Sequence, residues 1–86
     1  MQADFALLRD RVREVVRRSP VSERVNDIVL EADRDDEGTD FLRVVLEMKA
    51  IDDVDDSELE ALIESIEKAV GDVDERYPSV RFADAA

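Results

Sequence analysis

The stretch VNDIVLEADRDDEGTDFLRVVLEMK, residues 25–49, decides the fold. Residues 25–34 and 41–49 both alternate between apolar and polar side chains, a period of two that is typical of half-buried strands. Between them lies a polar, glycine-containing link, which predicts a hairpin loop. The residues expected to point toward the core are Ile28, Leu30, Ala32, Leu42, Val44, Leu46 and Met48.

The link itself begins like a calcium-binding loop. Asp33, Asp35 and Glu37 stand at positions 1, 3 and 5 of such a loop, and Gly38 stands at position 6. The twelfth position, however, must supply a bidentate carboxylate, and here it is Val44. Such a loop also lies between helices, and both flanks here have the period of strands. We therefore interpret the link as the polar end of a hairpin, with Gly38 turning the chain at positive φ and the acids facing water.

Two segments on either side of the hairpin have helical periodicity. Residues 4–18 carry one apolar stripe and stop at Ser19-Pro20, because proline disfavours helical backbone in the residue before it. Residues 57–76 carry a longer stripe and open with Ser57 and Glu60, spaced as a capping box. Gly71 lies inside this helix or ends its first part, so we expect the helix to end between residues 70 and 76. The apolar positions of the two stripes are Phe5, Leu8, Val12, Val15 and Val16, and then Leu59, Leu62, Ile63, Ile66, Val70 and Val73.

A last short strand is expected at residues 79–83, with Val80 and Phe82 facing inward, after a break at Tyr77-Pro78. The element order is therefore α-β-β-α-β, which predicts one small α+β domain over residues 1–86. The simplest arrangement is a three-stranded antiparallel sheet in the order 2-1-3, with the second helix on the face that carries Leu42, Val44 and Leu46.

This element order resembles half of a ferredoxin-like fold. It is also similar to the cytoplasmic domain of cation-diffusion-facilitator transporters, an α-β-β-α-β dimer. The resemblance implies a fold and a homodimer. It implies no metal site, since the chain has no histidine to match the metal-binding histidines of that family.

The charge of the chain restricts its partners. The formal net charge is −12, and it is unevenly spread, since residues 1–24 sum to +2 and residues 25–86 to −14. An acidic body argues against nucleic-acid binding, which depends on neutralising phosphates, and favours a basic protein partner. We find no signal peptide and no apolar stretch long enough to span a membrane, so a soluble cytoplasmic protein without a membrane partner is expected.

The residue types present argue against an enzyme. The chain has neither cysteine nor histidine, and only two glycines, so thiolate and imidazole chemistry and glycine-rich phosphate loops are all excluded. Its acids cluster in polar segments, where nothing would raise their pKa. We expect no catalytic residue, no cofactor and no dedicated metal site.

Two groups of residues are candidates for interaction. The first is the second face of the sheet, with Val29, Phe41, Arg43 and Val45, joined by Arg81 and Ala83 from the last strand. This face is bare if both helices pack on the other side, or is covered if the first helix crosses to it. The second group is the basic stripe of Arg9, Arg13 and Arg17, which could contact phosphate or an acidic protein, or pair with acids of the chain itself or of a second subunit.

These observations favour a protein–protein interaction module of unknown pathway. It would be a homodimer, or the acidic partner of another protein in the manner of an antitoxin, inhibitor or adaptor. The alternative is a protein that responds to divalent cations or salt, because six acids also crowd the stretch IDDVDDSELE at residues 51–60.

Overall fold

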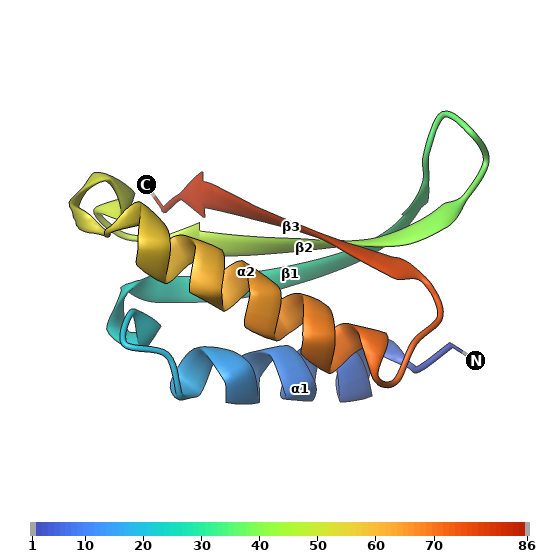
Figure 1. Cartoon of the computed structure of the whole chain (residues 1–86), viewed down its shortest axis with the longest axis horizontal. Helices are drawn as coiled ribbons and strands as arrows, with labels where there is room; N and C mark the ends of the chain where they lie inside the picture. The colour runs from blue at the N-terminus through green and yellow to red at the C-terminus, as the bar shows by residue number, and fades with distance from the viewer. Residues whose placement is uncertain (1, 86) are drawn as a thin grey trace.

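The computed structural model describes residues 2–85 and confirms the α+β class and the predicted element order (Figure 1). Two short 3-10 turns, Ser22–Arg24 and Ile51–Asp53, precede β1 and α2 respectively. The helices and strands are α1 (Phe5–Arg17), β1 (Val25–Arg34), β2 (Asp40–Met48), α2 (Asp56–Gly71) and β3 (Tyr77–Asp84).

Helix α1 begins and ends within one residue of the predicted range 4–18. The side chain of Asp4, the N-cap residue, accepts a hydrogen bond from the Leu7 amide at 2.8 Å and so satisfies one of the free donors of the first turn. The helix ends at Arg17, just before Ser19-Pro20. Its buried residues are Leu8, Val12 and Val16.

Helix α2 begins one residue earlier than predicted, and the capping box is wrong. Asp55 is the N-cap because it takes the extended backbone conformation that this position requires, so Ser57 lies within the first turn and no side-chain cap forms. Asp56 and Glu58 still lie at the positive end of the helix, where acids are favourable. The helix ends at Gly71, and the rest of the predicted range forms the connection to β3.

The sheet has the order β1-β2-β3, so the predicted order 2-1-3 is wrong. The hairpin places β1 antiparallel to β2, but β3 pairs in parallel with β2, so the sheet is mixed and the prediction of a fully antiparallel sheet is also wrong. The reason lies in α2, which crosses from the end of β2 back to the start of β3 and makes a βαβ unit whose two strands are neighbours. The expectation that β3 runs opposite to β1 is correct, although the two strands do not pair.

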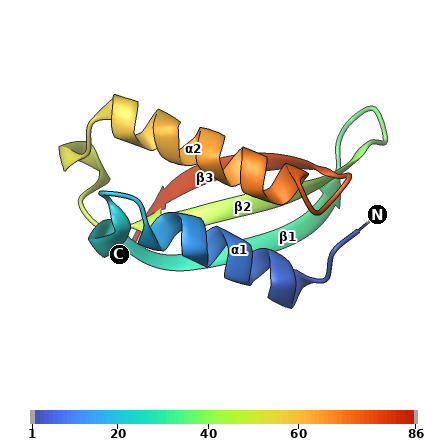
Figure 2. The same cartoon turned by 60° about the horizontal axis from the view of Figure 1, so that its bottom comes forward.

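Both helices cover the same face of the sheet (Figures 1 and 2). The inward residues of β2 are completely buried there, and Val80 and Phe82 of β3 pack against the same core, as predicted. No helix within residues 2–85 lies on the opposite face. The buried cluster consists of Leu8, Val12, Val16, Val21, Ile28, Leu42, Val44, Leu46, Met48, Leu62, Ile66 and Val70.

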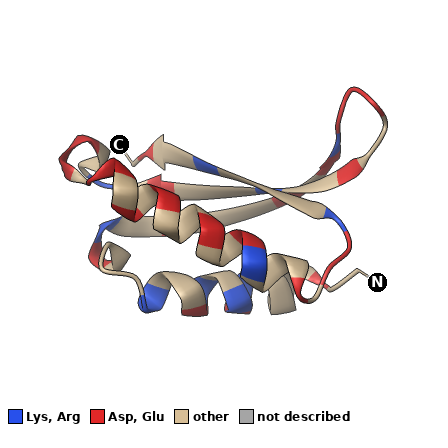
Figure 3. Ribbon diagram, viewed as in Figure 1, with Lys and Arg blue, Asp and Glu red and all other residues tan. Residues whose placement is uncertain are grey.

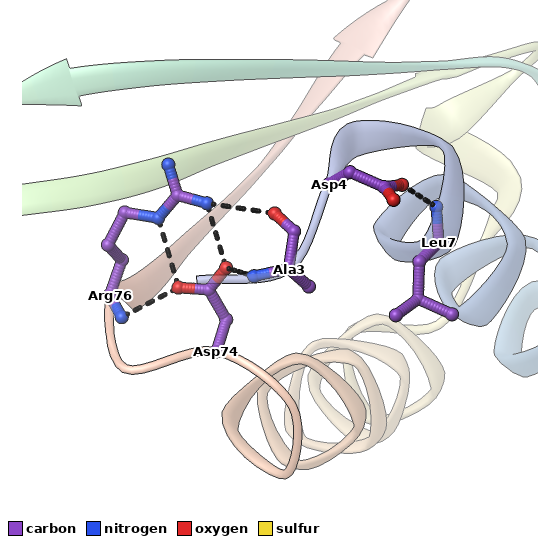
Figure 4. Close-up of polar contacts among 5 residues, drawn as sticks. All are labelled: Ala3, Asp4, Leu7, Asp74 and Arg76. Carbon is purple, nitrogen blue, oxygen red and sulfur yellow. Dashed lines mark hydrogen bonds and ion pairs between the residues drawn. The ribbon is translucent and has the colours of Figure 1, made fainter. Parts of the chain in front are cut away.

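A buried ion pair ties the N-terminal segment to the α2–β3 connection (Figure 4). The Arg76 guanidinium contacts Asp74 Oδ2 at 2.8 Å, and the Asp74 side chain is completely buried. The same carboxylate accepts from the Ala3 amide at 2.9 Å, and Arg76 also donates to the Ala3 carbonyl at 3.3 Å. The Arg76 hydrogen bonds are the main reason that the pKa of Asp74 lies well below its ordinary value, so this carboxylate remains charged although it is buried.

Candidate interaction surface

The sheet face opposite the helices is the candidate site, and we call it the open face. Neighbouring strands hold its side chains in rows, such as Asp33–Phe41–Tyr77 and Glu31–Arg43–Ser79. The next row is Val29–Val45–Arg81, an apolar pair followed by an arginine. The open face consists of Val29, Glu31 and Asp33 of β1, Phe41, Arg43, Val45 and Glu47 of β2, and Tyr77, Ser79, Arg81 and Ala83 of β3. Asp27, which lies opposite Glu47, is not included because its carboxylate turns to the β1 edge, where it contacts Arg9 at 3.2 Å and the Ile28 amide at 2.8 Å.

An aromatic pair organises one end of the open face. The rings of Phe41 and Tyr77 stack with their centroids 5.3 Å apart and an interplanar angle of 15°. The Arg43 guanidinium lies 5.2 Å from the centroid of the Phe41 ring, within range of a cation–π interaction. These contacts leave Phe41 only 7% exposed although no helix covers it, while Tyr77 remains 43% exposed.

Arg43 is also the centre of an ion-pair network across the hairpin. Its two terminal nitrogens contact Asp33 at 2.9 Å and Glu31 at 3.2 Å. The network raises the pKa of Arg43, chiefly through the hydrogen bond to Asp33. The pKa of Asp33 is lowered first by the hydrogen bond from the Arg34 amide and then by Arg43. The end of the open face is therefore held in one arrangement before any partner arrives.

The same end is anchored to the hairpin loop. The Tyr77 hydroxyl donates to Asp35 Oδ2 at 2.9 Å, while Asp35 Oδ1 accepts from the amides of Thr39 at 2.8 Å and Glu37 at 3.0 Å. These bonds, the Thr39 amide first, lower the pKa of Asp35. Gly38 has φ = 80°, as the turn interpretation predicts. The loop acids are thus not all free in water, because Asp35 is an internal support of the loop.

The middle of the open face is less polar. Val29 and Val45 lie opposite each other and are half-buried, and Arg81 continues their row. Arg81 and Glu47 form no ion pair within residues 2–85. The open face carries two arginines and three acids, a net charge of −1, so it is nearly neutral on a chain of net charge −12.

The arginine stripe of α1 serves the chain itself. Arg9 contacts Asp27 at 3.2 Å, Arg17 contacts Glu14 at 2.8 Å, and Arg13 lies 3.9 Å from Asp10. The structure therefore matches the alternative in which these arginines pair with acids of their own subunit. Since α1 covers the opposite side of the sheet, the stripe and the open face are separate surfaces.

The acid-rich stretches do not assemble into a metal centre within residues 2–85, since no three acidic side chains there converge on one point. In the first stretch, Asp33 and Asp35 are held by Arg43 and Tyr77. In the second, Asp53 lies 3.8 Å from Arg24. None of the described helices is long and apolar enough to cross a membrane.

Tyr77 is the residue of this site that the sequence interpretation missed. The sequence predicts a break at Tyr77-Pro78, yet β3 begins at Tyr77 and brings its ring beside Phe41. The available signal was the alternation of Tyr77, Ser79 and Arg81, which continues the outward set of β3 by one position. Proline is tolerated there because Pro78 lies on an edge strand.

Comparison with known proteins supports the fold. No family model matches the sequence, and no match is found among curated proteins. Among solved structures, two single-substitution variants of MamM-CTD each superpose with a TM-score of 0.55 at 15% identity, covering 96% of this chain and 100% of the other. A third MamM CTD variant gives a TM-score of 0.53 at 18% identity, covering 94% and 95% of the two chains. At this identity the likeness establishes a fold of the ferredoxin-like type.

Proposed function

We propose that this protein is a non-enzymatic interaction module that pairs with a second copy of itself through the open face. The observation that carries the proposal is that a complete sheet face has no helix over it, while its side chains are already fixed by aromatic and ionic contacts. A face ordered in advance loses little side-chain entropy when a partner covers it. The similarity in element order to the dimeric cytoplasmic domain of cation-diffusion-facilitator transporters supports the same assignment.

Charge favours a second copy at this face in particular. Two chains of net charge −12 repel each other, so they associate most easily through the surface on which the charge is smallest. The open face is nearly neutral and carries Arg81 and Glu47, which form no ion pair within the described residues 2–85. Around a two-fold axis, such a pair can supply complementary contacts to the same pair in the other copy.

The size of the open face predicts a weak dimer. Strands of eight to ten residues and three strand spacings give a face of about 30 by 14 Å, or roughly 400 Å² per copy. That is about half of a standard interface, so we expect a dissociation constant in about the micromolar range or weaker.

Sedimentation equilibrium of the full chain tests the proposal. We expect a monomer–dimer equilibrium that shifts toward the dimer as salt screens the repulsion between the acidic bodies. The variant Val45→Asp replaces apolar contact area at the centre of the open face by a negative charge, which meets the same charge of the second copy across the two-fold axis, and it should weaken the dimer at least about tenfold.

The matched control is Leu7→Asp, which makes the same kind of change at a leucine of α1 that is 46% exposed and far from the open face. It should leave the dimer unchanged. A wild-type chain that remains monomeric at millimolar concentration in high salt would refute the proposal. Equal effects of Val45→Asp and Leu7→Asp would refute the assignment to the open face.

A further inference from the structure

The sheet has two free edges, β1 and β3, and the chain treats them differently. An edge strand presents unpaired N–H and C=O groups, which can pair with a strand of another chain unless they are covered. Proteins usually cover such edges. The difference between the two edges therefore shows where pairing is blocked and where it is available.

The β1 edge is guarded by side chains at its two ends, which leaves only the outward amides of Leu30 and Ala32 open between them. Its outward backbone groups include those of Ile28, whose carbonyl accepts from Arg9 Nη2 at 2.7 Å and whose amide donates to Asp27 Oδ1 at 2.8 Å. Near the other end of the strand, the Arg34 amide donates to Asp33 Oδ1 at 2.8 Å. Both ends of this edge are thus occupied by the chain itself.

The β3 edge has no such protection from Val80 onward. The Ala85 amide donates to the Met48 carbonyl at 2.8 Å, and this bond fixes which β3 residues turn their backbone groups toward β2. By alternation, the amides of Val80, Phe82 and Asp84 point away from the sheet. No side chain within residues 2–85 accepts from any of these three amides. The backbone of Pro78 also faces away from the sheet, but proline has no N–H group to donate, so pairing with another strand is blocked only at the start of β3.

An acidic flank of α2 runs beside the same edge. Ser57, Ala61 and Ser65 line the space between α2 and α1, so helix geometry places the opposite flank on the β3 side. From Asp56 to Glu67 that flank is about 16 Å long, which is close to the length of the open part of β3 from Val80 to Asp84. Acids recur along α2 in Figure 3. Those of this flank, which form no ion pair within residues 2–85, are Asp56, Glu60 and Glu67.

We propose that the β3 edge binds an extended, basic segment of a partner protein as a fourth strand. Backbone hydrogen bonds to the amides of Val80, Phe82 and Asp84 would hold the segment, as in other cases of strand addition. Lysine or arginine at alternate positions would reach the acidic flank of α2. Half-exposed Val80 and Phe82 would be covered at the same time. A second copy of this chain fits the edge less well, because it would bring another acidic flank into the same place.

Amide hydrogen exchange measured by NMR on the full chain tests the proposal. The probe is a seven-residue peptide that alternates valine and lysine, with a glutamate-for-lysine peptide as the matched control. In the free protein, the amides of Val80 and Phe82 should exchange much faster than that of Arg81, which is bonded within the sheet. The lysine peptide should slow the exchange of Val80 and Phe82 by about tenfold or more and leave Ala32 on the β1 edge unaffected. The glutamate peptide should leave the exchange of all three amides unchanged.

Substitutions at exposed edge positions give a second readout. Asp84→Pro removes an outward amide without removing a bond to β2, and it should weaken peptide binding by about fivefold or more. Asp84→Asn, which removes the charge and keeps the amide, should bind almost as tightly as the wild type. Ala32→Pro, the same change on the β1 edge, should have no effect.

Binding of the lysine peptide without slower exchange at Val80 and Phe82 would overturn the proposal, because it would show attraction by charge alone. Equal binding of the glutamate peptide would overturn the choice of a basic segment. Repeating the titration in Val45→Asp separates this proposal from that of the open-face dimer, since strand addition at β3 does not need a second copy.

Discussion

The two faces of the sheet share the same three strands but are stabilised by different interactions. On the covered face, the even-numbered residues of β2 from Leu42 to Met48 are completely buried among the side chains of two helices. On the open face, the odd-numbered residues of the same strand are held by an aromatic stack and by ion pairs. The strand β2 thus faces an apolar core on one side and a polar, ordered surface on the other. We expect the covered face to determine the stability of the fold and the open face to determine recognition.

The largest expected effect comes from breaking the covered face. Leu46→Ala removes a side chain that is completely buried and leaves a cavity between the helices and the sheet. The free energy of unfolding should fall by about 3–5 kcal/mol, which is a large share of the stability of a domain this small. Urea unfolding followed by circular dichroism measures the loss. A loss below about 1 kcal/mol would show that the covered face is not the main source of stability.

The second largest effect on stability should come from the buried ion pair of Asp74 and Arg76, which lies on the helix side of the sheet beside an otherwise apolar core. Asp74→Asn leaves the Arg76 guanidinium without its charged partner and should cost about 2–3 kcal/mol at neutral pH. Because folding lowers the pKa of Asp74, its contribution is complete above the unfolded-state pKa of about 3.9 and declines as the pH falls toward the folded-state value. The difference between wild type and variant should therefore shrink below about pH 4.

Unfolding curves at several pH values check this prediction. A difference that stays constant from pH 6 to pH 2 would show that the carboxylate charge of Asp74 is not what stabilises the contact. Asp72→Asn, an exposed acid two residues earlier in the chain, is the matched control and should leave the curves almost unchanged.

Much of this contrast could be predicted from local sequence patterns. Alternation in residues 25–34 and 41–49 identified both strands and separated the inward from the outward residues of each, because the period of two is a property of the strand itself. Strand order is not a local property, and the order 2-1-3 failed because it depends on where α2 returns the chain. The same limit applies to the site. Phe41 and Arg43 could be assigned to the open face, but their contacts with Tyr77 depend on the parallel pairing of β2 and β3.

A smaller effect is expected when the corresponding large side chain of the open face is removed. Phe41→Ala loses the stack with Tyr77 and the contact with Arg43, but solvent can fill the space, since no helix lies above it. We expect a loss of about 1–2 kcal/mol, clearly below that of Leu46→Ala. The comparison requires both variants to be unfolded under the same conditions. Equal losses would mean that the two faces do not differ in how they stabilise the fold.

The smallest effect should come from the ion pairs of the open face. Arg43→Gln removes the centre of the network, but its partners Glu31 and Asp33 are half-exposed, and exposed ion pairs add little to stability. The free energy of unfolding should fall by less than about 1 kcal/mol, mainly through the lost contact with the Phe41 ring, and the informative quantity is the pKa of Asp33, measured by NMR titration. It should rise toward its ordinary value because the Arg43 contact is lost, yet stay below it because the Arg34 amide, the larger cause, remains. Arg81→Gln, on the same face and without an ion pair, should leave that pKa unchanged. A full return to the ordinary value in Arg43→Gln would show that the ion pair, and not the backbone amide, holds Asp33 charged.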